Sequence, residues 1–157
     1  MKRVVETRPI GNPIALVALH AGYSHTSLAL QSIKSFAAHE PFASHIQLFE
    51  SLVNSNPQQL LEQLVALAPS VIGFSTYLWN IHKSLHLAGL LEQLLSNPLI
   101  VLGGPEAGPR AEELLMAHPE IDFIIDGEGE RSFRDLMRWH FSAEGELGLI
   151  SGLVYRS

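Results

Sequence analysis

Four short apolar runs, each followed by a polar or glycine-rich segment, constrain the fold of this chain more than any other feature of its sequence. The runs cover residues 14–19, 71–74, 99–102 and 121–125. Each has the length and composition of a strand that is buried on both faces of a parallel sheet. In an open α/β sheet, the loops after the carboxyl ends of the strands form the ligand crevice. The segments after these runs therefore predict where a large polar ligand would lie.

Helix signals separate the apolar runs. Ser24 or Thr26 can cap a helix that leads to residue 36, and Asn56 before a proline opens a second helix that ends before residue 69. Asn80 or Thr76 can cap a third helix, which ends at residues 97–98. A fourth helix opens at residue 109 and ends before residue 118, and a fifth covers about residues 130–141. Residues 45–50 alternate in polarity and suit a further strand near an edge of the sheet.

This alternation predicts an α/β fold with a doubly wound, five-stranded parallel sheet of the Rossmann or flavodoxin-like type. For 157 residues the strand order 2-1-3-4-5 is favoured over the longer Rossmann order. Residues 149–150 and 153–155 flank Ser151-Gly152, a pair suited to a tight turn, and predict a C-terminal β ribbon. Because this ribbon has little left to pack on, we expect residues 1–157 to be a single domain at the N-terminal end of a longer protein.

Composition excludes several classes of function. The chain has no cysteine, which removes disulfides, thiolate zinc sites and cysteine-held iron–sulfur clusters. Its 10 Lys and Arg against 16 Asp and Glu give a charge of −6, which argues against a nucleic acid partner. No apolar segment is long enough for a signal peptide or for spanning a bilayer. We therefore expect a cytoplasmic protein without a membrane partner.

Other catalytic and metal-binding patterns are weak. His82 and His86 share one face of a predicted helix, but the His-Glu-x-x-His pattern of a metal site is missing. No Gly-x-Ser-x-Gly elbow is present to support a nucleophilic triad. A phosphoacceptor receiver domain needs acidic residues where this chain has His20 and Ser75, so that flavodoxin-like alternative is disfavoured.

The crevice segments supply the candidate binding residues. The histidines after the first strand are either ligand contacts or local hydrogen-bonding groups. The aromatic residues after the third strand either wall the crevice or pack under the next helix. The glycines after the fourth strand either admit a ligand to the backbone or only form a turn. The candidates are His20, Tyr23, Ser24, His25, Ser75, Thr76, Tyr77, Trp79, Asn80, Gly103, Gly104, Pro105, Glu106, Gly127, Glu128 and Gly129.

The last of these segments superficially resembles a dinucleotide-binding loop. Gly127 and Gly129 have the spacing of the first two glycines in Gly-x-Gly-x-x-Gly, but Ser132 stands at the position of the third. The segment also carries three acidic residues, which would repel a pyrophosphate. A simple dinucleotide site is therefore disfavoured.

Four segments together resemble a known family. They are Leu-His-Ala-Gly-Tyr-Ser-His-Thr-Ser at 19–27, Ile-Gly-Phe-Ser-Thr-Tyr-Leu-Trp-Asn at 72–80, Val-Leu-Gly-Gly-Pro-Glu at 101–106 and Asp-Gly-Glu-Gly-Glu at 126–130. In this order, at the ends of successive strands, they resemble the N-terminal cobalamin-binding domain of B12-dependent radical S-adenosylmethionine enzymes. The resemblance extends from residue 14 to about residue 155.

The resemblance implies a Rossmann-like domain that holds cobalamin, and therefore cobalt, at the crevice. The nucleotide tail of the cofactor would enter between the loops after the first, third and fourth strands. By this resemblance, Ser75 and Thr76 match hydroxyl positions near the tail and the lower face, and Gly103 and Gly104 match a close approach of the backbone to the tail. Residues 127–129 match the loop beside it.

One departure from related cobalamin domains concerns the cobalt ligand. Many of them carry Asp-x-His-x-x-Gly, whose histidine coordinates cobalt, but here Ala18 and Tyr23 flank His20 at the two defining positions. We therefore expect base-off cobalamin without a histidine lower ligand.

The resemblance also implies a partner domain. A C-terminal radical S-adenosylmethionine domain of the parent enzyme, of methyltransferase or cyclase type, would hold S-adenosylmethionine and a 4Fe-4S cluster on a Cys-x-x-x-Cys-x-x-Cys motif, which this chain lacks. We therefore expect no activity from this chain alone. The alternatives are an interaction or sensor domain that has lost the cofactor, or a flavin- or nucleotide-binding protein.

Overall fold

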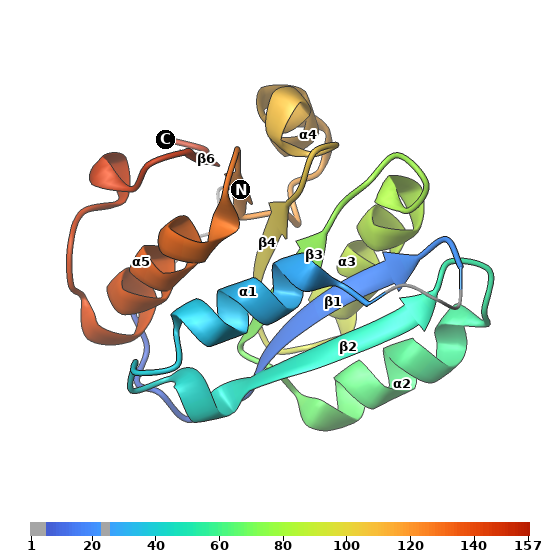
Figure 1. Ribbon diagram of the computed structural model, residues 1–157, viewed down its shortest axis with the longest axis horizontal. Coiled ribbons are helices and arrows are strands. Elements are labelled where there is room, and N and C mark those ends of the chain that lie inside the picture. Colours follow the sequence, from blue (N-terminus) through green and yellow to red (C-terminus); the bar gives the residue numbers. More distant parts are fainter. Residues whose placement is uncertain (1–5, 23–25) are drawn as a thin grey trace.

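A six-stranded sheet lies between two layers of helices (Figure 1) in the computed structural model, which describes residues 6–22 and 26–157. The strands run in the order β2-β1-β3-β4-β5-β6, and the first five are parallel. The predicted doubly wound α/β sheet and its order 2-1-3-4-5 are confirmed. The strand bounds are Ile14–His20 for β1, Ile46–Leu52 for β2, Val71–Ser75 for β3, Leu99–Gly103 for β4, Phe123–Ile125 for β5 and Leu153–Tyr155 for β6.

The C-terminal residues form a single strand rather than the expected ribbon. Strand β6 pairs antiparallel with β5, with Ile124 opposite Val154, whereas residues 147–149 form a short 3₁₀ helix. The outer edge of β5 offers unpaired backbone groups, and pairing with them satisfies the donors and acceptors of β6. The sheet edge therefore determines where the last strand lies.

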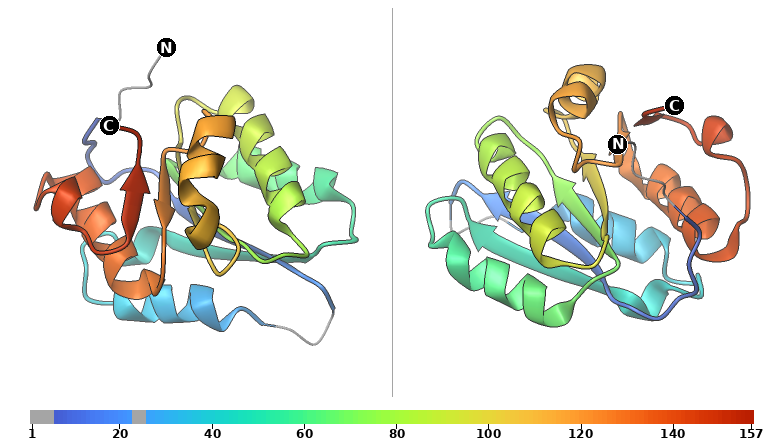
Figure 2. Two further views of the ribbon diagram at one scale, coloured as in Figure 1. Left: turned by 90° about the horizontal axis from the view of Figure 1, so that it is seen from above. Right: turned by 180° about the vertical axis from the view of Figure 1, so that it is seen from behind.

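The helices divide between the two faces of the sheet (Figure 2). Helices α1 (Leu28–Phe36) and α5 (Gly129–Ser142) cover one face, and α2 (Pro57–Leu67), α3 (Ile81–Leu94) and α4 (Ala111–Ala117) cover the other. Strand β1 shows why both faces are apolar, because Ala15 and Val17 pack in the core under α2 and α3 while Leu16 and Ala18 pack under α1 and α5.

Side-chain caps mark the starts of helices α1 and α2. Asn56 caps α2 as predicted, accepting a hydrogen bond from Gln58 N at 3.0 Å, with proline at the first helical position. Ser27 rather than Thr26 caps α1, through a bond from Leu30 N to its hydroxyl, and Ser24 lies outside the described residues. Asn80 precedes α3 but makes no cap bond to it. Within the described residues, no helix is long and apolar enough to cross a membrane.

Candidate functional site

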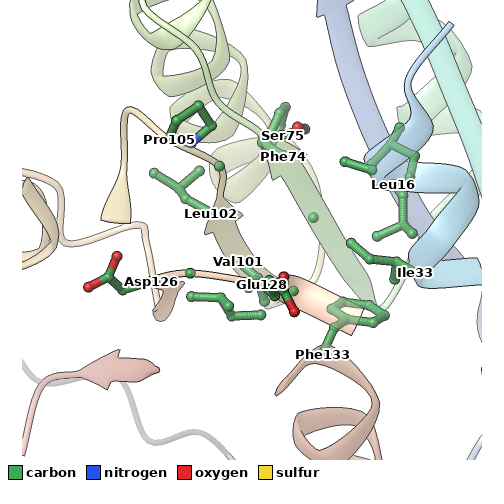
Figure 3. Close-up of a pocket in the computed structure, with 18 of the residues that line it drawn as sticks. Leu16, Ile33, Phe74, Ser75, Val101, Leu102, Pro105, Asp126, Glu128 and Phe133 are labelled. Carbon is green, nitrogen blue, oxygen red and sulfur yellow. The ribbon is translucent and has the colours of Figure 1, made fainter. Parts of the chain in front are cut away.

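A pocket of about 510 Å³ opens between the sheet and the helices α1 and α5. It lies along the carboxyl halves of β3 and β4, with α1 on one side and the start of α5 on the other (Figure 3). This volume falls in the range typical of small-molecule and cofactor sites. Its lining residues are Leu16, Ala29, Leu30, Ile33, Gly73, Phe74, Ser75, Tyr77, Val101, Leu102, Gly103, Gly104, Pro105, Pro109, Ile125, Asp126, Gly127, Glu128, Gly129, Glu130 and Phe133.

The inner end of the pocket is apolar. Leu16, Ile33 and Phe133 gather there, whereas Ser75 and Pro105 lie at the opposite end (Figure 3). Gly73 forms the floor between them. A Cβ on Gly73 would lie 2.8 Å from Leu16 Cδ2 and 3.8 Å from a ring carbon of Phe133, so the missing side chain is what leaves this part of the pocket open.

The mouth of the pocket contains residues from three of the predicted crevice segments, those after β3, β4 and β5. Ser75, Tyr77 and the residues Gly103, Gly104 and Pro105 line it from β3 and β4, and residues 127–129 line it from the loop before α5. Two glycines there adopt backbone angles that favour glycine, with φ of 105° at Gly104 and 94° at Gly127. The mouth is therefore built from backbone and small side chains, which a ligand can approach closely.

Thr76 fastens the β3 and β4 loops together and does not line the pocket. Its side chain is fully buried, and its Oγ1 donates to Gly103 O at 2.7 Å and accepts from Ala107 N at 3.1 Å. The Thr76 amide also donates to Gly103 O. A Cβ on Gly104 would clash with the Thr76 backbone, so Gly104 is required for this close packing of the two loops.

The Asn80 side chain fixes the conformation of the loop after β3 through hydrogen bonds to the backbone. Its Oδ1 accepts from Tyr77 N at 2.8 Å, and its Nδ2 donates to Leu19 O at 3.0 Å and to Ser75 O at 3.1 Å. The amide group is buried, so these bonds replace the ones that it would make to water. Asn80 thus positions the loop without lining the pocket.

Tyr77 and Trp79 form a stacked pair at the carboxyl edge of the sheet. Their ring centroids are 4.5 Å apart and the planes differ by 8°. Trp79 Nε1 donates to Leu19 O at 3.1 Å, and half of the Trp79 surface remains exposed. Tyr77 lines the pocket, whereas Trp79 stacks on it from outside the lining.

His20 lies at the end of β1, outside the pocket lining, and is engaged by β2. Its Nε2 lies 3.0 Å from Glu50 Oε1, and the same carboxylate oxygen accepts from Ser27 N at 2.5 Å. Glu50 thereby joins the end of β1 to the start of α1, which forms one wall of the pocket. Sequence reasoning missed Glu50, since nothing in the alternating strand 45–50 distinguishes it from an exposed residue.

Glu106 is also placed outside the pocket lining. Its Oε1 accepts from Arg110 at 2.9 Å, and the same guanidinium binds Glu113, whose pKa it lowers. Trp79, Thr76 and Asn80 likewise do not line the pocket, while Tyr23, Ser24 and His25 lie outside the described residues. Among the described residues, no three histidine or acidic side chains gather closely enough to hold a metal ion.

Acidic groups stand at the mouth of the pocket. Asp126 and Glu128 are exposed and Glu130 is half-buried, and all three are among the lining residues. Among the described lining residues there is no lysine or arginine. The field at the mouth therefore disfavours a multiply charged ligand such as a pyrophosphate and suits neutral amide and hydroxyl groups, which donate hydrogen bonds to carboxylates.

The apolar lining is what the sequence did not reveal. Leu16, Leu30, Ile33, Val101 and Phe133 each look like ordinary core residues in the sequence. The signal that was available is Gly73, a glycine inside an otherwise apolar strand run, because such a glycine often marks a close approach of a ligand or of another backbone.

Comparison with known proteins gives consistent results. A family model described as the B12 binding domain matches residues 14–137. Over 88 residues, 56% of this chain and 13% of the relative, the sequence is 32% identical to the cobalamin-dependent radical SAM methyltransferase TokK of Streptomyces tokunonensis. Over 69 residues, 44% of this chain and 10% of the relative, it is 35% identical to the 2-(S-pantetheinyl)-carbapenam-3-carboxylate methyltransferase of Streptantibioticus cattleyicolor.

The fold is shared with a solved structure. The cobalamin-dependent S-adenosylmethionine radical enzyme OxsB, in a structure with aqua-cobalamin and S-adenosylmethionine bound, superimposes with a TM-score of 0.79 at 22% identity. The match covers 94% of this chain and 21% of OxsB. The aligned regions thus make up about a fifth or less of each protein compared.

Proposed function

This chain belongs to the B12-binding domain family, and from that premise we propose that its pocket receives the nucleotide tail of a cobalamin whose corrin ring lies across the carboxyl edge of the sheet. When bound, the cofactor supplies a cobalt atom for methyl-transfer or radical chemistry, and the protein supplies position and environment. The family match and the relatives favour this function over a cofactor-free interaction domain and over a flavin- or nucleotide-binding protein.

The observation that carries the proposal is the shape and chemistry of the pocket. It combines an apolar inner end, which suits a heterocyclic base, with a mouth of glycines and hydroxyl groups, which suits a sugar and amide side chains. We assign Ser75, Tyr77, Gly103, Gly104 and Pro105 as contacts to the tail, together with residues 127–129. Thr76 and Asn80 act by fixing the β3 loop.

We further propose that cobalamin binds in the base-off form without a histidine lower ligand. Two observations support this. The pattern Asp-x-His-x-x-Gly is missing around His20, and the Nε2 of His20 is bonded to Glu50. The space between the sheet, α1 and α5 is large enough for a base that has left the cobalt.

Titration with hydroxocobalamin tests the proposal. The expected result is a saturable change of the cobalt absorption toward the base-off spectrum, with the cofactor co-eluting with the protein on gel filtration. Binding with a base-on spectrum would contradict the base-off form and the place of the base in the pocket, while cobalamin binding itself would stand. No spectral change and no co-elution would contradict the function itself.

We also propose that the chain is one domain, residues 1–157, of a longer enzyme with a radical S-adenosylmethionine domain. The aligned regions are only 13% and 10% of the two relatives, which supports the proposal. The exposed side chains of Leu78 and Trp79, 77% and 50% accessible, give such a domain an apolar surface beside the pocket mouth.

The isolated chain should then have no catalytic turnover, because it has no cysteine to hold the cluster that cleaves S-adenosylmethionine. The measurement is formation of 5′-deoxyadenosine under reducing conditions with no added protein. Production of 5′-deoxyadenosine by the purified chain would contradict the proposal.

A further inference from the structure

The floor of the pocket is a well in the surface of the sheet. Leu16, Gly73 and Val101 lie directly opposite one another on the adjacent strands β1, β3 and β4. Leu16 and Val101 each project a side chain toward the helices α1 and α5, whereas Gly73 between them projects none. The result is a depression one residue wide, at the inner end of the pocket.

Within residues 6–22 and 26–157, the walls of this well offer no hydrogen-bonding side chain. Leu30 and Ile33 of α1 and Phe133 of α5 close it from above, and Leu16, Leu30, Val101 and Phe133 are each no more than 2% exposed. The backbone groups of the floor are also committed, because β1, β3 and β4 are interior strands that pair on both sides. The polar lining residues stand at the mouth instead.

We propose that this well selects the base of the cobamide tail, accepting a dimethylbenzimidazole and rejecting an adenine. The inference rests on the proposed function, since it concerns the inner end of the same pocket. Dimethylbenzimidazole presents two methyl groups on its outer edge, which gain from burial among Leu16, Ile33 and Phe133. Adenine presents an exocyclic amine and ring nitrogens, which would lose their bonds to water without finding partners.

The size of the effect follows from the cost of burying an unpaired polar group. One such group lowers affinity by about tenfold, and adenine would bury more than one. The expected ratio of dissociation constants, adeninylcobamide over cobalamin, is therefore tenfold or more. Cobinamide, which lacks the nucleotide, should bind more weakly than cobalamin because it leaves the well unfilled.

The experiment measures the dissociation constants of hydroxocobalamin, its adeninyl analogue and cobinamide by absorption titration with the purified chain. Equal affinity for cobalamin and the adeninyl analogue would overturn the inference while leaving the proposed function intact. Equal affinity for cobalamin and cobinamide would overturn the inference and also the proposed place of the tail in the pocket, leaving only the binding of the corrin ring. No binding of any of the three would overturn both.

A pair of variants locates the selectivity in the well. Val101→Thr places a hydroxyl at the floor with almost no change of volume, and it should reduce the preference for cobalamin over the adeninyl analogue several-fold. Val71→Thr is the matched control, because Val71 lies on the same face of the sheet in the same core cluster but outside the pocket lining.

Val71→Thr should leave the ratio of the two dissociation constants unchanged. Urea denaturation identifies any general loss of stability that the two variants share. An unchanged ratio in folded Val101→Thr, or an equal change in both variants, would contradict the assignment.

Discussion

Two neighbouring glycines at the pocket mouth differ in what a side chain would do. At Gly104 a Cβ would clash with the backbone of Thr76, and φ is 105°. At Gly103 the nearest atom to a Cβ would be Ile125 O at 4.0 Å, so the space in front of it is open. Gly104 is therefore required for the turn, whereas a side chain at Gly103 would project into open space at the mouth.

We predict that Gly104→Val lowers the free energy of unfolding by at least about 2 kcal/mol, from backbone strain and steric overlap. Gly103→Val should fold normally, since valine suits a strand, and should weaken cobalamin binding by narrowing the mouth. Urea denaturation and absorption titration measure the two effects. A Gly103→Val protein with parental affinity would show that the tail does not pass this residue.

His140 is buried in the core, and neither of its ring nitrogens has a hydrogen-bond partner in the part of the chain that the structure describes. Burial, together with the positive charge of Arg8, lowers the pKa of His140 from 6.5 to about 4. The unfolded chain therefore takes up this proton at a higher pH than the folded chain does. Above about pH 6.5 His140 is neutral in both states and does not lower the free energy of unfolding. As the pH falls from 6.5 toward 4, the unfolded chain is protonated first, and the free energy of unfolding decreases.

We predict that His140 lowers the free energy of unfolding by about 3 kcal/mol across that interval, because a pKa difference of one unit between the two states corresponds to about 1.4 kcal/mol. His140→Phe should flatten this part of the pH profile, and His86→Gln, at an exposed helix position, should not. The measurement is urea denaturation at several pH values. An identical slope in the parent and His140→Phe would exclude His140 as the source.

At the scale of elements, helix α1 depends on strand β2 for its position. The carboxylate of Glu50 accepts the Ser27 amide at the helix start and contacts His20 at the end of β1. Charge-assisted bonds of this kind are stronger than neutral ones. Because α1 contributes Leu30 and Ile33 to the pocket, its position also sets the width of the site.

Replacing Glu50 by alanine should therefore cost about 1–3 kcal/mol and increase amide exchange in the first turn of α1 more than in α5. Cobalamin affinity should fall as well. Glu62→Ala, which removes an exposed carboxylate that accepts a hydrogen bond from Gln58 on α2, is the control. Unchanged exchange in α1 of the Glu50→Ala protein would show that packing alone holds the helix.

The same elements show how far sequence reasoning extends. The apolar runs identified β1, β3 and β4 because interior parallel strands need apolar side chains on both faces. The cap of α1 was missed because Thr26 and Ser27 are both suitable, and a residue of β2 decides between them. The mouth residues follow from their place after strands, whereas the inner walls do not, since core and pocket residues look alike in sequence.

At the scale of the whole molecule, Arg156 joins the segment after β6 to helix α4 and to the segment that follows α4. Its guanidinium donates to Leu115 O at 2.6 Å and Pro119 O at 3.1 Å, and also to Ile121 O. The Leu115 carbonyl lies in the last turn of α4, and the other two lie in the segment between α4 and β5. Arg156 thereby fixes β6 at the edge of the sheet from beyond the strand itself.

Truncating this side chain should release β6 and destabilise the fold by about 1–2 kcal/mol, because several carbonyls lose a charged donor. The variants to compare by urea denaturation are Arg156→Ala and Arg131→Ala, the latter at a side chain that is 79% exposed. A single cooperative transition is expected for both, as for a one-domain protein. Equal stability of the two variants would contradict the structural role of Arg156.

The stacked aromatic pair at the pocket edge also gives the protein an internal optical reporter. Of the two tryptophans, Trp79 stacks on the pocket-lining Tyr77, whereas Trp139 packs edge-on against Phe123 away from the lining. A corrin absorbs near-ultraviolet light in the region where indole emits. A corrin ring bound beside Trp79 would therefore quench the fluorescence of Trp79 by energy transfer. In a Trp139→Phe protein, Trp79 is the remaining tryptophan, so a decrease in tryptophan fluorescence would report that the site is occupied.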